Sequence, residues 1–162
     1  MLRDVLDHNL TVVFCGTAVG TKSAERAAYY AGPGNKFWRT IHRIGLTPRH
    51  LRPEEFKSLP QFGVGLTDLV KVKSGADSDL KAGHFDVPAL EEKIRKHAPR
   101  ILCFNGKKAA QVFLKTKSVN YGVVESPFDQ TTLFVAPSTS GAANGFWDES
   151  FWFTLAQLCK YD

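Results

Sequence analysis

Short apolar runs alternate with amphipathic stretches along the chain. Four runs are rich in β-branched and large apolar residues, which is typical of strands buried on both faces; they span 11–15, about 63–67, 100–104 and 132–136. The other stretches have helical spacing and cover 35–44, 53–58, about 88–97, 106–115 and the chain from about 148 onward. Strands that alternate with helices form parallel sheets covered on both faces. The pattern therefore predicts an α/β fold, a three-layer α/β/α sandwich around a central four-stranded parallel sheet, in a single domain over 1–162.

Capping and turn residues mark the ends of several predicted helices. Asn35 stands before the first apolar positions of its helix, and Gly45 follows the last of them. Asp86 introduces the 88–97 helix, which Pro99 ends because proline cannot continue a helix. Residues 73–85 are rich in Gly, Ser and Asp and are expected to form a long loop.

Each predicted strand is followed by a polar or glycine-rich motif. The four motifs are GTAVG at 16–20, TDLVK at 67–71, FNGK at 104–107 and PSTSGAA at 137–143. Ligands of open parallel sheets bind outside the carboxyl ends of the strands, so the motifs are expected to share one site. In the first motif two glycines allow a sharp turn with outward-facing N–H groups. That spacing is neither a dinucleotide fingerprint nor a P-loop, and an ordinary strand–turn–helix corner remains the alternative interpretation.

Composition limits the class of protein. The 162 residues are 43% hydrophobic, enough for a core, and contain no 18-residue apolar run that would span a membrane. The N-terminus lacks the apolar block of a secretory signal, and three widely spaced cysteines suit free thiols in a cytoplasmic protein. The net charge of +5 and pI of about 9.2 suit a polyanionic partner such as nucleic acid. The histidines and cysteines have no metal-ligand spacing, so neither metal nor cofactor is expected.

Five segments together resemble the mismatch-specific uracil-DNA glycosylase and thymine-DNA glycosylase family. They are VVFCG at 12–16, GPGNKFW at 32–38, LPQFGVGLTDLV at 59–70, FNGK at 104–107 and APSTSGAA at 136–143. They occur in the family's order and cover nearly the whole chain. The resemblance implies a uracil-DNA glycosylase-like fold and excision of uracil from DNA, including G·U mismatches. One departure is important, because the family's first motif carries an Asn that helps to position the attacking water, and this chain has Ala18 there.

The chemistry of glycosidic bond cleavage selects candidate catalytic groups. Negative charge grows on the leaving base, and fixed N–H donors stabilise it; the backbone of Gly16, Thr17 and Ala18 is the candidate. Positive charge grows on the sugar, and a carboxylate can stabilise it or activate water. Asp68 is the candidate, since it follows the second strand, although the family usually has Lys or Asn there. The alternatives are that Asp68 only caps a turn, or that Asp77 or Asp79 supplies the acid.

The resemblance also places residues around the base. Tyr30 matches the aromatic residue on which the family stacks the extracted base, with Tyr29 as its competitor for this role. Ser23 matches a small residue near the 5-position of the pyrimidine, or it serves as a turn cap. Asn35 either caps its helix, which we favour, or hydrogen-bonds the base.

A stacked base is reached only after it is flipped out of the duplex. The loop that resembles the family's DNA-inserting segment comprises Ser138, Thr139, Ser140, Gly141, Ala142 and Ala143. Its hydroxyl and N–H groups can bind phosphates, but it lacks the family's Leu or Arg wedge, so single-stranded DNA is an expected substrate too. Basic residues near the motifs either face DNA or form a solvated surface: Lys36, Arg39, Arg43, Arg49, Arg52, Lys71 and Lys73.

The sequence thus favours a monomeric, monofunctional DNA glycosylase acting on uracil-containing DNA. No lysine stands out as a Schiff-base nucleophile, which favours simple hydrolysis without strand cleavage. Two other classes stay open. One is a DNA-binding homologue impaired by the change to Ala18, and the other is an α/β enzyme that acts on nucleosides or nucleotides.

Overall fold

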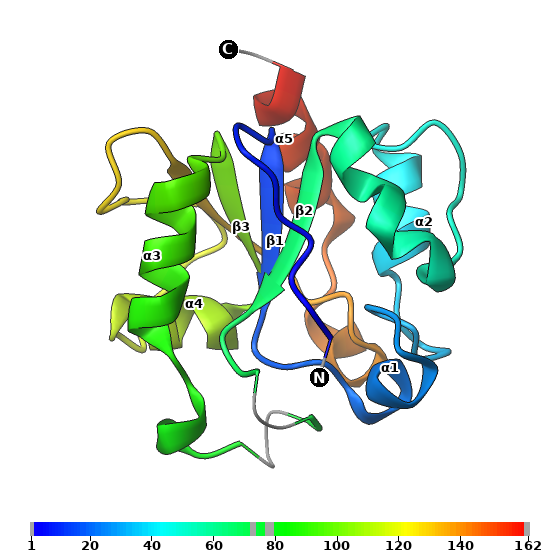
Figure 1. Ribbon diagram of the computed structural model, residues 1–162, viewed down its shortest axis with the longest axis horizontal. Coiled ribbons are helices and arrows are strands. Elements are labelled where there is room, and N and C mark those ends of the chain that lie inside the picture. Colours follow the sequence, from blue (N-terminus) through cyan, green and yellow to red (C-terminus); the bar gives the residue numbers. More distant parts are fainter. Residues whose placement is uncertain (1, 72–73, 77–79, 161–162) are drawn as a thin grey trace.

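A five-stranded sheet forms the centre of the molecule (Figure 1). This computed structural model describes residues 2–71, 74–76 and 80–160. The strands are β1 (Val12–Gly16), β2 (Val64–Asp68), β3 (Ile101–Asn105), β4 (Gly122–Val124) and β5 (Thr132–Ala136), in the order β2-β1-β3-β5-β4. The four predicted strands are all present and parallel to one another, which confirms the α/β prediction.

The prediction of four strands was wrong by one. The short strand β4 pairs antiparallel with β5 at the edge of the sheet. It has three residues, none of them fully buried, and begins at Gly122 with a φ of 102°. An edge strand of this length produces no apolar run, which is why the hydrophobic pattern does not reveal it.

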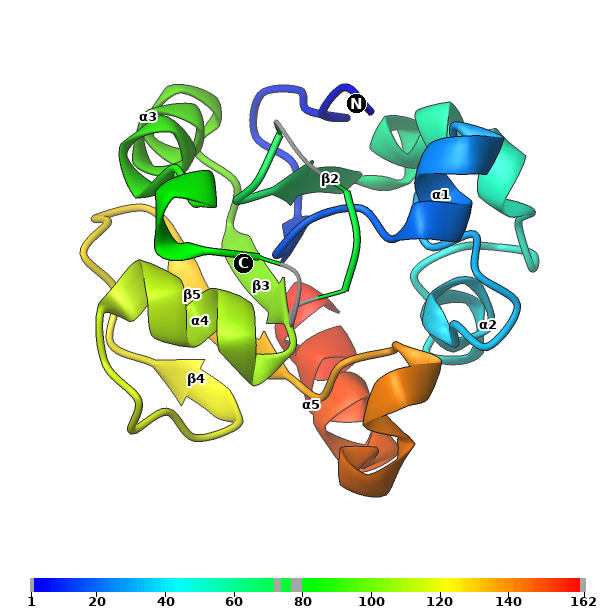
Figure 2. The same cartoon turned by 90° about the horizontal axis from the view of Figure 1, so that it is seen from below.

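Helices cover both faces of the sheet, as the three-layer prediction requires. The α-helices are α1 (Thr21–Arg26), α2 (Phe37–Arg43), α3 (Val87–His97), α4 (Lys107–Leu114) and α5 (Glu149–Lys160). Among the described residues, the 3₁₀ segments η1 (Pro53–Phe62), η3 (Ala82–His84) and η4 (Gly141–Phe146) lie between them. Figure 2 shows α3 and α4 on one side of the sheet and α2 and α5 on the other. No helix in the described part of the chain is long and apolar enough to cross a membrane.

Alternating side chains of β1 supply two separate apolar layers. Val12 and Phe14 pack with Ile41 of α2 and Trp152 of α5. Val13 and its neighbours on that face pack instead with α3 and α4. Every residue of β1 is buried, so the strand is fixed on both sides and its carboxyl end is held in place.

Two helix boundaries differ from the prediction. The segment after the GTAVG motif was not among the predicted helices, but it forms α1, a polar helix of six residues without an apolar stripe. Helix α2 begins at Phe37, not at Asn35; the Asn35 side chain accepts a hydrogen bond from the Phe37 backbone N–H at 2.9 Å just before the helix. The predicted cap of α3 is confirmed, because Asp86 accepts a hydrogen bond from Ala89 N.

The register of the parallel strands places four residues at one edge. Gly16 pairs with Asp68 across β1 and β2, and Asn105 pairs with Ala136 across β3 and β5. Cys15 pairs with the residue before Asn105, so the ends of β1 and β3 are level too. The segments that follow these ends therefore start side by side.

Candidate active site

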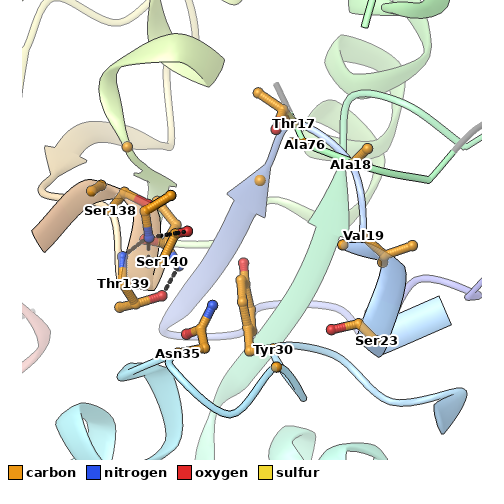
Figure 3. A pocket seen from close by; sticks show the side chains of 18 of the residues that line it. Thr17, Ala18, Val19, Ser23, Tyr30, Asn35, Ala76, Ser138, Thr139 and Ser140 are labelled. Atoms are coloured by element: carbon orange, nitrogen blue, oxygen red, sulfur yellow. Dashed lines mark hydrogen bonds between the residues drawn. The ribbon is translucent and has the colours of Figure 1, made fainter. Parts of the chain in front are cut away.

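A cavity of about 960 Å³ lies at this edge of the sheet. It is lined by the ends of β1, β2 and β3, by the 32–35 loop and by the segment after β5. The residues proposed from the sequence all line it: Gly16, Thr17, Ala18, Ser23, Tyr30, Asn35, Asp68, Ser138, Thr139, Ser140, Gly141, Ala142 and Ala143. Figure 3 shows several of these side chains around the open space. The structure therefore brings together all of these candidates.

Asp68 lies at the floor of the cavity and is only 4% exposed. A Cβ atom placed on Gly16 would lie 3.1 Å from Asp68 Oδ1 and 3.6 Å from the Tyr30 hydroxyl. The carboxylate and the phenol thus approach the same point beside the end of β1. The side chain of Asp68 faces the cleft shared by β1 and β2, as its position after β2 predicts.

A half-buried lysine holds the other oxygen of this carboxylate. Lys71 Nζ lies 3.1 Å from Asp68 Oδ2 and 2.7 Å from Asp4 Oδ1. Burial raises the pKa of Asp68, although the charge of Lys71 opposes the rise. Burial alone would lower the pKa of Lys71, but the carboxylates of Asp68 and Asp4 outweigh it and raise that pKa. Sequence reasoning recorded Lys71 only as a basic residue and did not consider Asp4.

The two adjacent tyrosines have different environments. Tyr29 is 1% exposed, and its hydroxyl donates to Arg3 O and accepts from Lys71 Nζ. Tyr30 adopts a left-handed backbone with φ of 52°, and its ring stacks on Phe37 at a centroid distance of 4.1 Å. The ring of Tyr30 stands at the pocket wall with its hydroxyl at the far end (Figure 3). Tyr29 therefore belongs to the core, and Tyr30 is the tyrosine whose ring is placed to meet a ligand.

The Tyr30 hydroxyl is the buried side-chain polar atom that lacks a hydrogen-bond partner within the described residues. Burial raises the pKa of this phenol well above its ordinary value, and the Asp68 carboxylate adds to the rise. The hydroxyl is therefore protonated at neutral pH and keeps a donor for a molecule that enters the cavity. An unpaired buried hydroxyl is costly, so a bound ligand or water that accepts this hydrogen bond is stabilised.

Ser23 and Asn35 both fix the backbone around Tyr30. Ser23 Oγ accepts a hydrogen bond from Ala31 N at 2.9 Å, which closes the turn that contains the tyrosines. Asn35 Oδ1 accepts from Phe37 N, and its amide nitrogen points toward the cavity (Figure 3). The amide nitrogen is thus able to donate to a ligand while the oxygen stays in its local turn.

Asn105 holds the segment after β5. Its Nδ2 donates to Thr139 Oγ1 at 2.9 Å, and its Oδ1 accepts from Thr139 N at 3.0 Å. The Thr139 carbonyl in turn accepts from Lys36 N at 2.9 Å. Sequence reasoning gave Asn105 no role, although its place at the end of a strand in FNGK is equivalent to that of Asp68 in GLTD and could have identified it.

The rim of the cavity carries an exposed aromatic residue. Phe146 ends η4, lines the cavity and is 74% exposed. Beside it, Lys36 Nζ hydrogen-bonds Asn144 and lies 5.0 Å from the centre of the Trp147 ring. Phe146 therefore presents an exposed aromatic ring at the rim of the cavity.

Several basic residues expected near the site are paired with glutamates. Arg43 pairs with Glu149, and both Arg49 and Arg52 pair with Glu55. These three arginines therefore belong to surface ion pairs, whereas Lys22, Lys107 and Lys108 line the cavity.

Some candidates cannot be placed. Lys73, Asp77 and Asp79 lie outside the described residues. Within the described ranges, no group of three or more His, Cys, Asp or Glu side chains is arranged to hold a metal ion.

Two comparisons with known proteins bear on this site. The sequence model of the uracil DNA glycosylase superfamily matches residues 3–158. The structure is also similar to a solution NMR structure of a protein from Methanosarcina acetivorans, described as a candidate uracil DNA glycosylase. That similarity has a TM-score of 0.63 at 27% sequence identity and covers 99% of this chain and 97% of the other. Both matches include every strand end that lines the cavity.

Proposed function

Because this chain belongs to the uracil DNA glycosylase superfamily, we propose that it removes uracil from DNA by hydrolysing the N-glycosidic bond and leaves an abasic site. The observation that carries the proposal is the buried carboxylate of Asp68 beside Gly16, at the floor of a cavity large enough for a nucleoside. The five motifs support assignment to the mismatch-specific branch, and we infer that G·U pairs are among its substrates.

Asp68 supplies the negative charge that the reaction needs at the sugar. In the ionised form it stabilises the oxocarbenium-like sugar and orients or deprotonates the attacking water. Asp68 stands at the end of the neighbouring strand β2 and takes over the role of the Asn that this chain lacks at position 18. The raised pKa of Asp68 is consistent with a group that exchanges a proton during a catalytic cycle.

The leaving base is stabilised by groups that do not ionise. The backbone N–H groups of the turn at Gly16, Thr17 and Ala18 face the base carbonyl oxygen, where they stabilise developing negative charge. Tyr30 stacks on the base, and Asn35 donates a hydrogen bond from its amide nitrogen. Ser23, which also lines the cavity, limits the space near the 5-position of the pyrimidine.

DNA is held by the segment after β5. Ser138 and Ser140 offer their hydroxyl groups to phosphates, while the N–H groups of Ala142 and Ala143 donate to Ser140 and hold the segment in shape. The segment is packed tightly, since a Cβ atom on Gly141 would lie 3.2 Å from Gly34 O. Phe146, at the end of the same segment, is positioned to contact bases that neighbour the flipped nucleotide, because apolar side chains can wedge between base steps.

A single assay tests this function against its alternatives. The protein is incubated with end-labelled DNA that contains one uracil, as a single strand and opposite G or A, and is then treated with alkali. We expect breaks at the uracil in each substrate after alkali and none before it. A mobility shift without breaks would identify a binding protein, and neither result would favour an enzyme of free nucleosides. The same DNA with cytosine in place of uracil is the matched control.

A further inference from the structure

Lys71 is the centre of a partly buried network that joins the N-terminal segment to the floor of the cavity. Besides Asp68 and Asp4, Lys71 Nζ contacts the Tyr29 hydroxyl at 2.9 Å and Leu2 O at 3.2 Å. A lysine ammonium has three N–H donors, and here four acceptors surround it. This arrangement fixes the position of the ammonium and leaves little freedom for it to move away from Asp68.

The N-terminal segment is attached directly to β2. Val5 and Leu66 exchange two backbone hydrogen bonds of 2.9 and 2.8 Å in an isolated antiparallel bridge. Asp4 also accepts from Thr67 Oγ1 at 2.8 Å, and its other oxygen pairs with Lys93 of α3 at 2.7 Å. Asp4 therefore has a defined position, because it directly precedes the bridge between Val5 and Leu66 of β2.

The carboxylates of Asp68 and Asp4 share the positive charge of Lys71. Lys71 lies between the carboxylates of Asp68 and Asp4. Asp4 is additionally neutralised by Lys93, and the two lysines hold its pKa below the ordinary value despite burial. The remaining titratable groups that face Asp68 are Tyr29, Tyr30 and Cys15, and burial keeps the pKa of each of these groups high, so they stay neutral.

We propose that Lys71 is a positioning residue for Asp68 and that Asp4 positions Lys71, so that the N-terminal segment completes the active site. This inference rests on the proposed function, in which Asp68 acts in its ionised form. Lys71 fixes Oδ2, which directs Oδ1 toward Gly16 and the Tyr30 hydroxyl. Asp4 sets how much of the positive charge of Lys71 is available to Asp68.

Substitutions of Lys71 and Asp4 should shift the pH dependence of excision in opposite directions. Lys71→Met removes the cation nearest to Asp68, which raises the pKa of this carboxyl further. The acid limb of the single-turnover rate should then move to higher pH by at least one unit. At a fixed pH on that limb, the rate should be at least tenfold lower than in the wild type. Asp4→Asn removes the competing carboxylate and lowers the pKa of Asp68, so the limb should move to lower pH. Lys71→Arg keeps the charge, and its limb should stay between those of the wild type and Lys71→Met.

A structural role alone would give a different result. Loss of packing lowers the rate at every pH and leaves the limb in place. Limbs that move in the same direction in Lys71→Met and Asp4→Asn, or an unmoved limb in Asp4→Asn, would overturn the proposal. Asp4→Asn keeps the size of the side chain, so it provides this test even if Lys71→Met does not fold.

A second measurement does not depend on uracil excision. The ¹³C carboxyl shift of Asp68 can be followed against pH by NMR in this 18.0 kDa protein. We expect its midpoint to rise in Lys71→Met and to fall in Asp4→Asn. If the wild type excises no uracil, the proposed function fails, yet these midpoints still decide whether Lys71 and Asp4 control Asp68. Unchanged midpoints in an active enzyme would reject the network alone.

Discussion

Replacement of Asp68 by Asn is the most direct perturbation of the proposed mechanism. The amide has the size of the carboxylate and can still accept the hydrogen bond from Lys71, but it carries no charge and cannot take a proton from water. Lys71 keeps its ion pair with Asp4 at 2.7 Å. The change therefore removes the charge of residue 68 and leaves the surrounding network in place.

The expected loss of rate follows from that charge. Two unit charges about 4 Å apart attract by about 4 kcal/mol at an effective dielectric constant of about 20. Each 1.36 kcal/mol of transition-state stabilisation corresponds to about a tenfold change in rate, so loss of the sugar–carboxylate attraction costs about 10³-fold. A positioned general base contributes about 10²–10⁴-fold. We expect Asp68→Asn to lower single-turnover excision by about 10²–10³-fold.

The same substitution has the opposite consequence for stability. Burial raises the pKa of Asp68 above 3.8, the ordinary value for an aspartate. The free energy of unfolding therefore falls as the pH rises from the ordinary pKa to the raised one, because the carboxyl ionises more readily in the unfolded chain than in the folded protein. At neutral pH the ionised carboxylate is therefore a cost to the fold, which Asn removes. We expect the thermal midpoint of Asp68→Asn to be equal to or higher than that of the wild type.

The assay measures excision under single-turnover conditions across pH, together with DNA affinity and the thermal midpoint. The wild-type rate should show an acid limb above pH 3.8, and Asp68→Asn should lack it. Asp86→Asn is the matched control, because Asp86 caps α3 away from the cavity and Asn caps equally well. Excision by Asp68→Asn within threefold of the wild type would refute the reasoning and direct attention to Asp77 and Asp79.

Three other substitutions test the rest of the site. Tyr30→Ala should lower single-turnover excision by about ten- to a hundredfold, because base–aromatic stacking is worth about 1–3 kcal/mol; an unchanged rate would exclude the stack. Gly16→Ala should reduce excision at least tenfold without loss of fold, since the new methyl group occupies the space between Asp68 Oδ1 and the Tyr30 hydroxyl; this is measured by the same assay with a thermal melt. Phe146→Ala should weaken excision from duplex more than from single-stranded DNA, whereas Phe153→Ala, at a side chain 42% exposed outside the cavity, should affect neither. Equal losses on the two substrates would rule out a role for Phe146 in opening the duplex.

The parallel core of this fold is predictable from the sequence because its strands are buried on both faces. Each residue of β1 is buried, and its sequence VVFCG is the apolar run that such strands produce. The edge strand β4 and the short helix α1 lack that signal. Their conformations depend on pairing with β5 and on the turn that Ser23 closes, and these are tertiary contacts with no periodic pattern.

Part of the site is also readable from the sequence. A polar residue at the carboxyl end of a predicted parallel strand faces the ligand crevice by the geometry of the fold, which is why Asp68 could be named. The choice between Tyr29 and Tyr30 could not be made with certainty from two identical neighbours. The left-handed backbone of Tyr30 turns the second ring toward the cavity, and only the structure shows it. Lys71 and Asp4 are 67 positions apart, and the antiparallel bridge at Val5 that joins them is too short to predict.

The register between β1 and β2 connects the two positions, 18 and 68, at which this chain departs from the motifs of the mismatch-specific family that it resembles. An acid on β2 reaches the crevice only if the in-register residue of β1 leaves room for it, and that residue is Gly16. Any side chain there would lie within 3.1 Å of Asp68 Oδ1. In the proposed mechanism the acid on β2 replaces the amide side chain two residues beyond Gly16, and Ala18 is sufficient because the turn contributes only its backbone. Gly16, Ala18 and Asp68 would then meet one chemical requirement together, and the ion pair with Lys71 offsets part of the cost of burying the acid.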